Sequence, residues 1–320
     1  MGNKGKKRSF GLNQQFKNQV DLIIPVYHPN DKFKKLLEKL MMQTIKPNKI
    51  FIMHTVEDES IQLEIPDIAK DIVEIHPIKK EDFDHGATRR YGADLSESDI
   101  IMLMTQDAIP ADEFLIEKMV IPFNDSKVAV SYARQIPYKN ANLLEKMTRV
   151  YNYPNKKEVK SSRDIQRLGI KTFFCSNVCA AYRKEAYEKA GGFVEKTIFN
   201  EDMIMAFALV GIGYKIAYAA DAKVFHSHNY SYLQHFRRNF DLGVSHRQYS
   251  ELFRSVKSES EGIKMIFTLT NALIKRKKYS ALIELVITSG FKFMGYKLGY
   301  YYRILPKKFV NLFTMNKSFW

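Results

Sequence analysis

The sequence predicts an α/β fold with a mostly parallel sheet, followed by a C-terminal helical extension. Two observations predict the sheet. Residues 100–104, IIMLM, form an unbroken apolar run, which is typical of a strand buried on both faces. Along residues 21–104, short apolar runs alternate with segments of helical periodicity, as in consecutive βαβ units. The extension is predicted by two apolar segments, 263–274 and 281–291, which basic residues separate.

The first half of the chain alternates strand and helix. Asp31 can cap the first helix, whose apolar side chains recur at helical spacing, and a second helix is expected over residues 88–95. Strands are expected at residues 21–27, 49–54, 72–75 and 100–104. Neither a G-x-G-x-x-G motif nor a Walker loop follows the first strand, so dinucleotide-binding and P-loop domains are disfavoured.

In the second half the alternation is looser. The polar and basic residues 152–169 predict a mobile loop, and residues 172–181 are an apolar stretch. Helices are expected at residues 143–151 and 184–190 and from residue 199 to residue 210, and strands at 127–132, 214–218 and 223–225.

The length and composition allow a sizeable core, because 45% of the 320 residues are hydrophobic. We expect a basic tail at residues 1–19, one α/β domain at 20–251 and the helical region at 252–320. The two cysteines, Cys175 and Cys179, fit neither a disulfide framework nor a zinc site, so a reducing, cytosolic setting is expected. The sequence shows no signal peptide and no run of the roughly 20 apolar residues that a spanning helix needs.

The net charge of +15 lies at the two ends of the chain. Residues 1–20 carry five basic residues and no acid, and residues 262–320 carry eleven basic residues and one acid, which leaves the region between them neutral. A nucleic-acid-binding domain more often carries its basic excess within the fold, so nucleic acid is not an expected partner. Basic ends around a neutral body favour a soluble catalytic core that its ends hold on an anionic membrane surface.

The apolar run at residues 100–104 ends in Thr105, Gln106 and Asp107. Open α/β sheets bind ligands at the carboxyl ends of their strands. A carboxylate held there can ligate a hard divalent cation, Mg²⁺ or Mn²⁺, which neutralises a diphosphate. The alternative is that Asp107 caps a helix that starts near Asp112.

Several segments between residues 20 and 251 carry a family resemblance through their order and spacing. They are DLIIPVYHP, QTIKPNKIFI, FDHGATRRYGA, MLMTQDAIP, ARQIP, GIKTFFCSNVCAAYRKEAYEKAGGF, FNEDMIMA and AKVFHSHNYS. With these segments the chain resembles the inverting GT-A glycosyltransferases of family 2, and more closely their bacterial rhamnosyltransferases. The resemblance implies a Rossmann-like GT-A domain that takes a sugar from a nucleotide-diphosphate donor.

The resemblance also implies the donor site. The expected donor contacts are Pro25, Tyr27, Asp84, His85, Arg89, Gln106 and Asp107. The turn at residues 55–60 departs from the Asp-rich turn of many relatives, so the contact to the base falls to Glu57 or Asp58. Gly86 would let the backbone approach a ligand, and the following helix would favour a diphosphate, onto which Arg89 can fork.

Asp107 stands where the family has its Asp-x-Asp element, with Gln106 in place of the first acid, so the metal would depend on one carboxylate. A histidine can complete the site. His226 and His228 follow a predicted strand, and alternate side chains of a strand point to the same face. We favour His226 as the ligand and leave His228 open. The alternative is a hydrogen-bonded structural histidine.

Asp202 is the expected general base, because a helix N-terminus keeps a carboxylate ionised, as a base requires. The alternative is that Glu201 and Asp202 are only favourable first-turn acids. Glu201 is expected to be structural or to contact the sugar, and it and Arg237 are candidates for the acceptor or diphosphate site. Gln234 and Arg237 resemble a motif of processive relatives, with Arg238 in place of its tryptophan. A plain basic helix face is the other interpretation.

The resemblance implies transfer of L-rhamnose from dTDP-L-rhamnose to a lipid-linked saccharide in cell-surface polysaccharide synthesis. The alternatives are a UDP-hexose donor on the same fold, or a non-catalytic basic membrane-binding module. Basic and aromatic residues interleave over residues 263–309, which favours anchoring on anionic lipid. We therefore expect a cytoplasmic enzyme, peripheral at the inner face of the cell membrane. The alternative for these helices is a packing or dimerisation module, which would give a homodimer.

Overall fold

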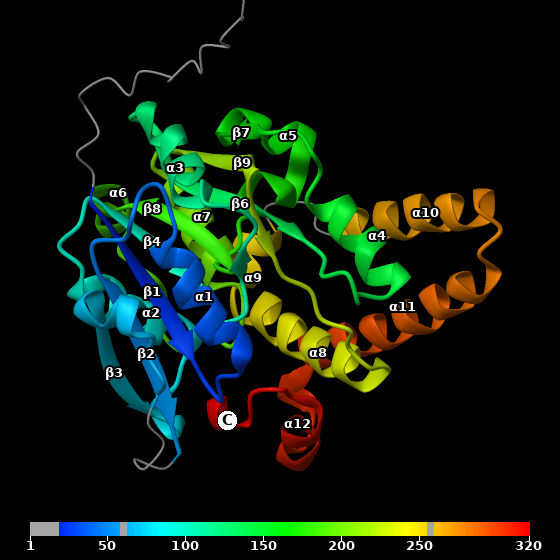
Figure 1. Ribbon diagram of the computed structural model, residues 1–320. Coiled ribbons are helices and arrows are strands. Elements are labelled where there is room, and N and C mark those ends of the chain that lie inside the picture. The colour runs from blue at the N-terminus through cyan, green and yellow to red at the C-terminus, as the bar shows by residue number, and fades with distance from the viewer. Residues whose placement is uncertain (1–18, 58–62, 255–258) are drawn as a thin grey trace, which may run out of the picture.

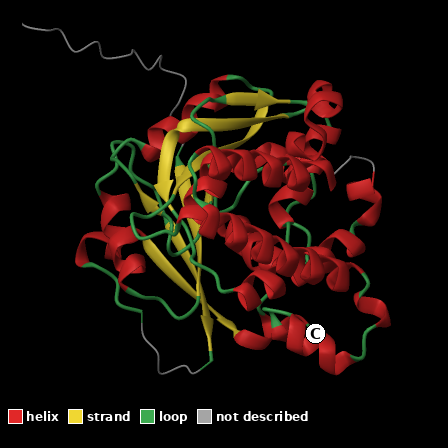
Figure 2. Cartoon of the chain, turned by 90° about the vertical axis from the view of Figure 1, so that its right-hand side faces the viewer, coloured by secondary structure: helices red, strands yellow, loops and turns green. Residues whose placement is uncertain are grey.

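The computed structural model describes residues 19–57, 63–254 and 259–320, which build one curled sheet with helices on both of its faces (Figures 1 and 2). The predicted α/β class is therefore confirmed. The predicted basic tail, apart from Gln19, and the predicted donor residue Asp58 lie outside the described residues.

The strands run in the order β3-β2-β1-β4-β8-β6-β9-β5, and β7 pairs with β9. The strands are β1 (Val20–Val26), β2 (Ile50–Val56), β3 (Val73–Lys79), β4 (Ile100–Met104), β5 (Ile109–Pro110), β6 (Val128–Ile136), β7 (Glu158–Lys160), β8 (Cys179–Arg183) and β9 (Lys215–Phe225). The helices are α1 (Asp31–Met41), α2 (His85–Leu95), α3 (Leu115–Val120), α4 (Leu143–Asn152), α5 (Ile165–Leu168), α6 (Lys184–Lys189), α7 (Glu201–Gly211), α8 (Tyr232–Gln248), α9 (Ser250–Arg254), α10 (Glu259–Lys275), α11 (Tyr279–Tyr300) and α12 (Lys307–Phe313).

The expectation of a mostly parallel sheet is correct for the first half and wrong for the second. Strands β1 to β4 pair in parallel, whereas β8 runs antiparallel to both β4 and β6. Strands β5 and β7 are antiparallel to β9, and only β6 and β9 are parallel there. An apolar run buried on both faces looks the same in either direction, so the residue pattern does not fix the orientation of β8.

Two other expectations for the second half are corrected. The strands expected at 214–218 and 223–225 are one strand, β9, whose register with β6 shifts between Ala219 and Lys223. The expected mobile loop at 152–169 contains β7 and α5. It is held to the sheet because β7 pairs with β9 and the buried Lys160 ammonium donates 2.9 Å to the carbonyl of Lys171.

The core lies in two layers, one on each face of the sheet. Alternate residues of a strand enter opposite layers: Met102 packs toward α1 and α3, whereas Leu103 packs toward α2, α6 and α7. Every residue of β4 is fully buried, which agrees with the unbroken apolar run. The strand is therefore a rigid support for the residues that follow Met104.

Helix α11 crosses α8 at close range, and glycines form the crossing. A Cβ atom added to Gly299 would overlap the carbonyl oxygen of Phe240, and one added to Gly295 would overlap that of Phe236. On α8, Gly243 lies equally close to the backbone of α11 at Tyr296. The two backbones therefore touch directly, and α8, which the sequence placed in the α/β domain, forms one unit with α11.

We expect Gly299→Ala to lower the free energy of unfolding by about 1–3 kcal/mol, because the added methyl group overpacks the crossing. Gly290 on the same helix is the matched control, since nothing lies within 4 Å of a Cβ atom there. Gly290→Ala should instead raise stability by up to about 1 kcal/mol through helix propensity. Denaturant unfolding followed by circular dichroism measures both, and equal shifts in the two variants would contradict the packing argument.

The end of the chain returns to the domain. Asp241 on α8 accepts hydrogen bonds from the Thr314 hydroxyl (2.6 Å) and the Met315 amide (3.0 Å), and residues 317–319 lie beside residues 80–82 (Figure 1). Within the described ranges, no helix has both the length and the apolar character needed to span a bilayer.

Candidate active site

The carboxyl ends of β1, β2 and β4 meet at one edge of the sheet. The Gln106 side chain links two of them, because its carbonyl accepts from the Tyr27 amide (2.8 Å) and its amide donates to the Tyr27 carbonyl (2.9 Å). Glu57, at the end of β2, accepts from the Tyr27 hydroxyl and the Lys80 ammonium. Tyr27, Glu57 and Gln106, three of the predicted donor residues, therefore lie together, and Pro25 lies in β1.

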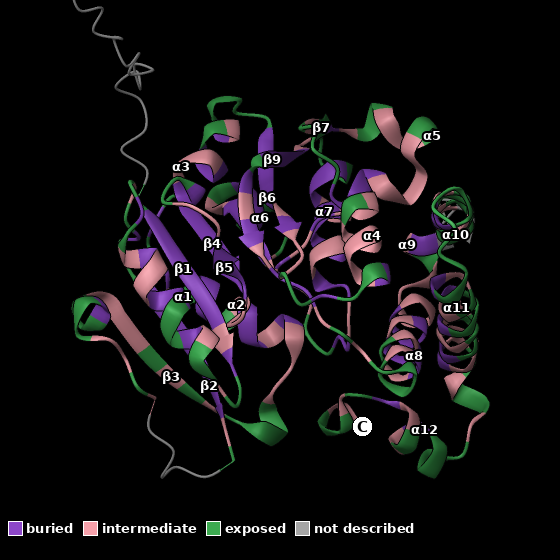
Figure 3. Cartoon of the chain, turned by 45° about the vertical axis from the view of Figure 1, so that its right-hand side comes forward, coloured by how far each residue is buried: buried purple, intermediate pink, exposed green. Residues whose placement is uncertain are grey.

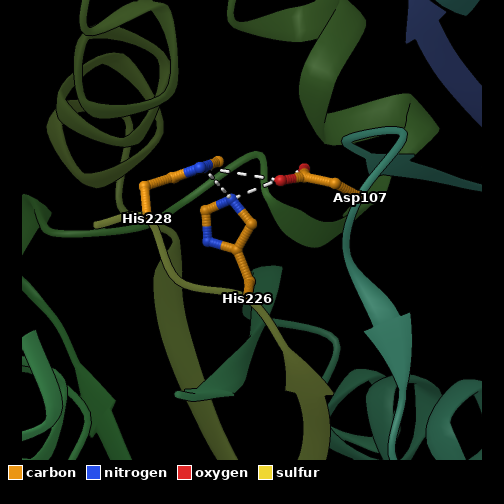
Figure 4. Close-up of side chains that lie close together, drawn as sticks. All are labelled: Asp107, His226 and His228. Atoms are coloured by element: carbon orange, nitrogen blue, oxygen red, sulfur yellow. Dashed lines mark hydrogen bonds and ion pairs between the residues drawn. The ribbon is translucent and has the colours of Figure 1, made fainter. Parts of the chain in front are cut away.

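Asp107, His226 and His228 converge at the same edge (Figure 4). Asp107 follows β4, and both histidines follow β9. The Asp107 carboxylate lies 3.6 Å from Nε2 of His226 and 3.4 Å from Nε2 of His228, and the two Nε2 atoms are 3.1 Å apart. Asp107 does not cap a helix: α3 begins only at Leu115, and Asp112 accepts from the Phe114 amide before it.

Gln135 on β6 fixes the orientation of His226. Arg149 donates to Oε1 of Gln135, and an arginine can only donate, so this atom must be the oxygen. The same oxygen lies 3.0 Å from Nδ1 of His226, which therefore carries the hydrogen. The Nε2 lone pair of His226 then faces Asp107 and His228.

The donor set fits a divalent cation. Burial lowers the pKa of His226 well below its ordinary range, and it lowers the pKa of His228 against the pull of Asp107, so both rings are neutral. Two neutral imidazoles and one carboxylate, with a hydrogen-bonded outer partner on His226, are typical of a divalent metal site. The structure brings both candidate histidines to Asp107 rather than one of them.

We expect Gln135→Leu to weaken metal binding about 10–100-fold, because His226 loses the partner that sets its tautomer. Titration of Mn²⁺ followed by electron paramagnetic resonance measures this affinity directly. Gln248→Leu, on α8 and outside this cluster, is the control and should bind Mn²⁺ as the wild type does. Unchanged affinity in Gln135→Leu would show that the tautomer does not depend on Gln135.

Asp202 is the second residue of α7, which follows a turn at Asn200, whose φ of +67° is left-handed. Its carboxylate accepts from the amides of Met203 (2.7 Å) and Asn177 (3.2 Å). Burial, together with the charge of Glu201, raises the pKa of Asp202 to about 7. Asp202 therefore has the proton affinity of a group that can exchange a proton near neutral pH.

The metal cluster and Asp202 are joined by a short path. Gln135 Nε2 donates to the hydroxyl of Ser176 at 3.0 Å. The backbone N–H of the next residue, Asn177, donates to the Asp202 carboxylate. The polar pair Ser176-Asn177 that interrupts the apolar stretch is therefore the link between the two candidate functional groups.

Glu201 forms a buried ion pair with Arg89 of α2, in which Arg89 Nε lies 3.3 Å from the carboxylate and both side chains are 8% exposed. Burial opposes ionisation of Glu201, but Arg89, His85 and the Asn177 amide together hold its pKa below the usual value. Breaking such a pair leaves a buried charge unpaired. Arg89 thus lies against Glu201, and its contact to a diphosphate remains a prediction.

At the start of α2, the residues predicted to contact the donor make contacts within the protein itself. Asp84 accepts from the amides of Gly86 (3.0 Å) and Ala87 (2.7 Å) and caps the helix, and burial lowers the pKa of His85 to about 4. A Cβ atom at Gly86 would overlap the carbonyl oxygen of Val194. The close approach that glycine permits here is therefore to residue 194, not to a ligand as the sequence suggested.

On α8, the three residues compared with the motif of processive relatives make different contacts. Gln234 accepts from the Ser231 amide at 2.8 Å and caps the helix. Within the described residues, Nε of Arg237 has no hydrogen-bond partner. Arg238 is exposed, and its guanidinium lies 4.6 Å from the ring centre of Phe199, two residues before Glu201. Its charge acts on His85, His226 and His228, whose pKa values it helps to lower.

Two residues near the site were not found from the sequence. Gln135 lies in a run with no motif of its own, although the segment ARQIP that contains it was part of the resemblance. Arg238 was noted only as a replacement for tryptophan. Its place four residues after Gln234, on a helix that follows the histidine segment, was the available signal, since residues three or four apart share a helix face.

Comparison with known proteins identifies the family of the chain. The family model described as glycosyl transferase family 2 matches residues 21–191. The chain is 38% identical over 307 residues to the O-antigen chain rhamnosyltransferase RfbN of Salmonella typhimurium, with 94% of this chain and 96% of that protein covered. It is 36% identical over 302 residues to the O-antigen chain rhamnosyltransferase WbaN of Salmonella anatum, with 93% and 95% covered.

Two solved structures share the fold at low sequence identity. The mannosyltransferase PcManGT from Pyrobaculum calidifontis, solved with GDP-Man and Mn²⁺, has a TM-score of 0.60 and 13% identity, with 92% of this chain and 89% of that chain covered. TarS 1–349 of S. aureus, solved with UDP-GlcNAc, has a TM-score of 0.50 and 12% identity, with 89% and 91% covered. The family match, the relatives and the common fold lead to one conclusion: this chain is a member of glycosyl transferase family 2, as the resemblance predicted.

Proposed function

We propose that this protein transfers L-rhamnose, with inversion, from dTDP-L-rhamnose to a lipid-linked saccharide during synthesis of a surface polysaccharide. The observation that carries the proposal is the 38% identity to an O-antigen chain rhamnosyltransferase across nearly the whole of both chains. The convergence of Asp107, His226 and His228 beside a base candidate supports it, because sugar transfer needs a stabilised leaving group and a proton acceptor.

The chain's own residues supply the proton transfer. An acceptor hydroxyl gives its proton to Asp202 while its oxygen attacks the anomeric carbon of the sugar. The bond from that carbon to the diphosphate oxygen breaks, and the electron pair leaves with dTDP. Single displacement inverts the anomeric carbon. The edge formed by Tyr27, Glu57 and Gln106 would hold the donor.

Asp107, His226 and His228 would hold Mg²⁺ or Mn²⁺. When bound, the cation supplies positive charge to the departing diphosphate. Arg238 extends the positive charge toward these residues, and Arg237 and Glu201 remain proposed contacts of the acceptor or diphosphate.

The C-terminal helices would hold the protein on an anionic membrane surface. Large apolar side chains of α10 and α11 are exposed, including Phe267, Ile283 and Val286, and the basic residues 275–278 lie between the helices (Figure 3). An exposed apolar face beside clustered basic residues suits the interface of a lipid bilayer. This placement would leave the enzyme peripheral on the cytoplasmic side, and a homodimer through the same face is the competing outcome.

Donor selection tests the proposal. Calorimetric titration of dTDP-L-rhamnose, UDP-glucose and UDP-GlcNAc, each with Mn²⁺ or Mg²⁺ and without either, should show metal-dependent binding of dTDP-L-rhamnose at least tenfold tighter than that of the others. Tighter binding of a UDP-sugar would replace the rhamnose assignment by a hexose. Absence of binding by all three would support a non-catalytic membrane-binding module.

A further inference from the structure

A cavity of about 440 Å³ lies between α4, α8, α10 and α11. Its size falls within the roughly 300–1,000 Å³ of small-molecule sites in proteins. His228 is part of both this cavity and the metal cluster, so the cavity begins at the candidate active site. We call it the helical cavity.

One end of the helical cavity is polar. Glu145 accepts from the His228 amide at 3.4 Å, and Tyr230 stacks on the His228 ring. Lys292 lies near Glu145, whose charge acts on it. Within the part of the chain that the structure describes, the Lys292 ammonium makes no hydrogen bond or ion pair, although burial lowers its pKa. A partly buried cation without a bonded partner is suited to an anionic ligand group.

Apolar side chains make up much of the remaining wall, with Thr148, Thr288 and Ser289 among them. Leu144, Leu269 and Leu285 are buried there and belong to one small hydrophobic cluster, and Met265 packs against it. The apolar part of the wall would leave the hydroxyl groups of a sugar or a nucleotide placed against it without partners, which costs binding free energy. A hydrocarbon chain has no such groups and gains from burial.

The cavity also reaches the exposed apolar surface of the helices. Ile263 and Phe293 line it and are 56% and 62% exposed. Next to them on the same helices lie the exposed apolar residues that we proposed for membrane contact (Figure 3). The helical cavity therefore connects that surface with His228.

We propose that the helical cavity binds the phosphate-bearing end of the hydrocarbon chain of a lipid-linked acceptor, with Lys292 paired to the phosphate. This inference rests on the proposed transferase function. The cavity holds a short length of chain, so the rest of the lipid stays in the bilayer. The attached saccharide would then extend past His228 toward Asp202.

Binding of alkyl phosphates, measured by calorimetry below their micelle-forming concentrations, tests this. Each buried methylene should improve affinity on the order of three-fold, so decyl phosphate should bind more than tenfold tighter than hexyl phosphate. Inorganic phosphate should bind weakest of the three. Equal binding of inorganic and decyl phosphate would mean that the site takes a free phosphate and no chain, and would overturn the proposal.

Two variants fill the cavity and one does not. Thr288→Phe and Ser289→Phe add a ring to residues that line it, whereas Val150→Phe adds the same ring at an exposed residue outside it. The first two should weaken decyl phosphate at least tenfold and the third should not. Lys292→Gln should remove the preference for decyl phosphate over decanol, with Lys189→Gln, at an exposed residue of α6, as its control.

Titration of dTDP-L-rhamnose on the same variants separates the two proposals. If the donor binds normally and decyl phosphate binds equally to all variants, adsorption is non-specific and the cavity inference fails while the transferase function stands. If the wild type does not bind the donor, the transferase function fails. Retained donor binding also shows that the filled variants are folded.

Discussion

Asp202→Asn is expected to lower kcat by about 10²–10⁴-fold, because the acceptor hydroxyl loses the group that takes its proton. The amide keeps the size of the side chain, and its one oxygen can still accept from the backbone amide of Met203, so donor affinity should change little. Product formation from dTDP-L-rhamnose, followed by mass spectrometry of the glycosylated acceptor, measures the rate. Asp221→Asn, at an exposed residue of β9, is the control and should retain full activity.

The pH dependence gives a second measurement on the same residue. Burial and the charge of Glu201 raise the pKa of Asp202 from 3.8 to about 7, so kcat/KM should rise with pH through about 7 as the carboxylate forms. The free energy of unfolding should instead fall as the pH rises. The folded state binds the extra proton between pH 3.8 and about 7, so this contribution to stability is present at low pH and lost across that window. Asp202→Asn should lack both dependences, and an unchanged rate profile would exclude Asp202 as the base.

Asp107→Asn is expected to lower kcat about 10²-fold or more and to weaken Mn²⁺ binding, because an amide brings no charge to the cation. Asp99→Asn is a matched control, since Asp99 is exposed just before the other end of the same strand, β4. Activity assays across a range of Mn²⁺ concentrations separate lost affinity from lost rate. Wild-type activity of Asp107→Asn at trace Mn²⁺ would mean that the two histidines and the carboxylate do not form a metal site.

The sequence predicted the first half of the fold well, because βαβ units can be recognised from apolar runs that alternate with segments of helical periodicity. The strand β4 was predicted at its observed residues. The second half was harder. The direction of β8 depends on the strands beside which it lies. Its apolar residues would be buried equally well in a parallel or an antiparallel strand, so they do not indicate the direction. The continuity of β9 was hidden by the register shift near Ala219, where the alternation of side chains is interrupted.

The candidate site was predictable where its functional residues directly follow the end of a strand. Asp107 and the histidines of the β9 exit were identified in this way, and the structure brings them together. Gln135 was not, because its importance arises from its contact with His226, which is 91 residues away in the sequence. The Arg89–Glu201 pair was missed for the same reason, although both residues had been singled out separately.

The glycine crossing of α8 and α11 has a practical consequence for recombination between relatives. A hybrid joined after α8, at the end of the predicted α/β domain, would fail wherever the foreign α11 lacks glycine at the positions of Gly295 and Gly299. Such a helix would bring Cβ atoms against the backbone at Phe236 and Phe240, where there is no room for them. A breakpoint before Ser231 would move α8 and its partner together, so hybrid enzymes should be joined there.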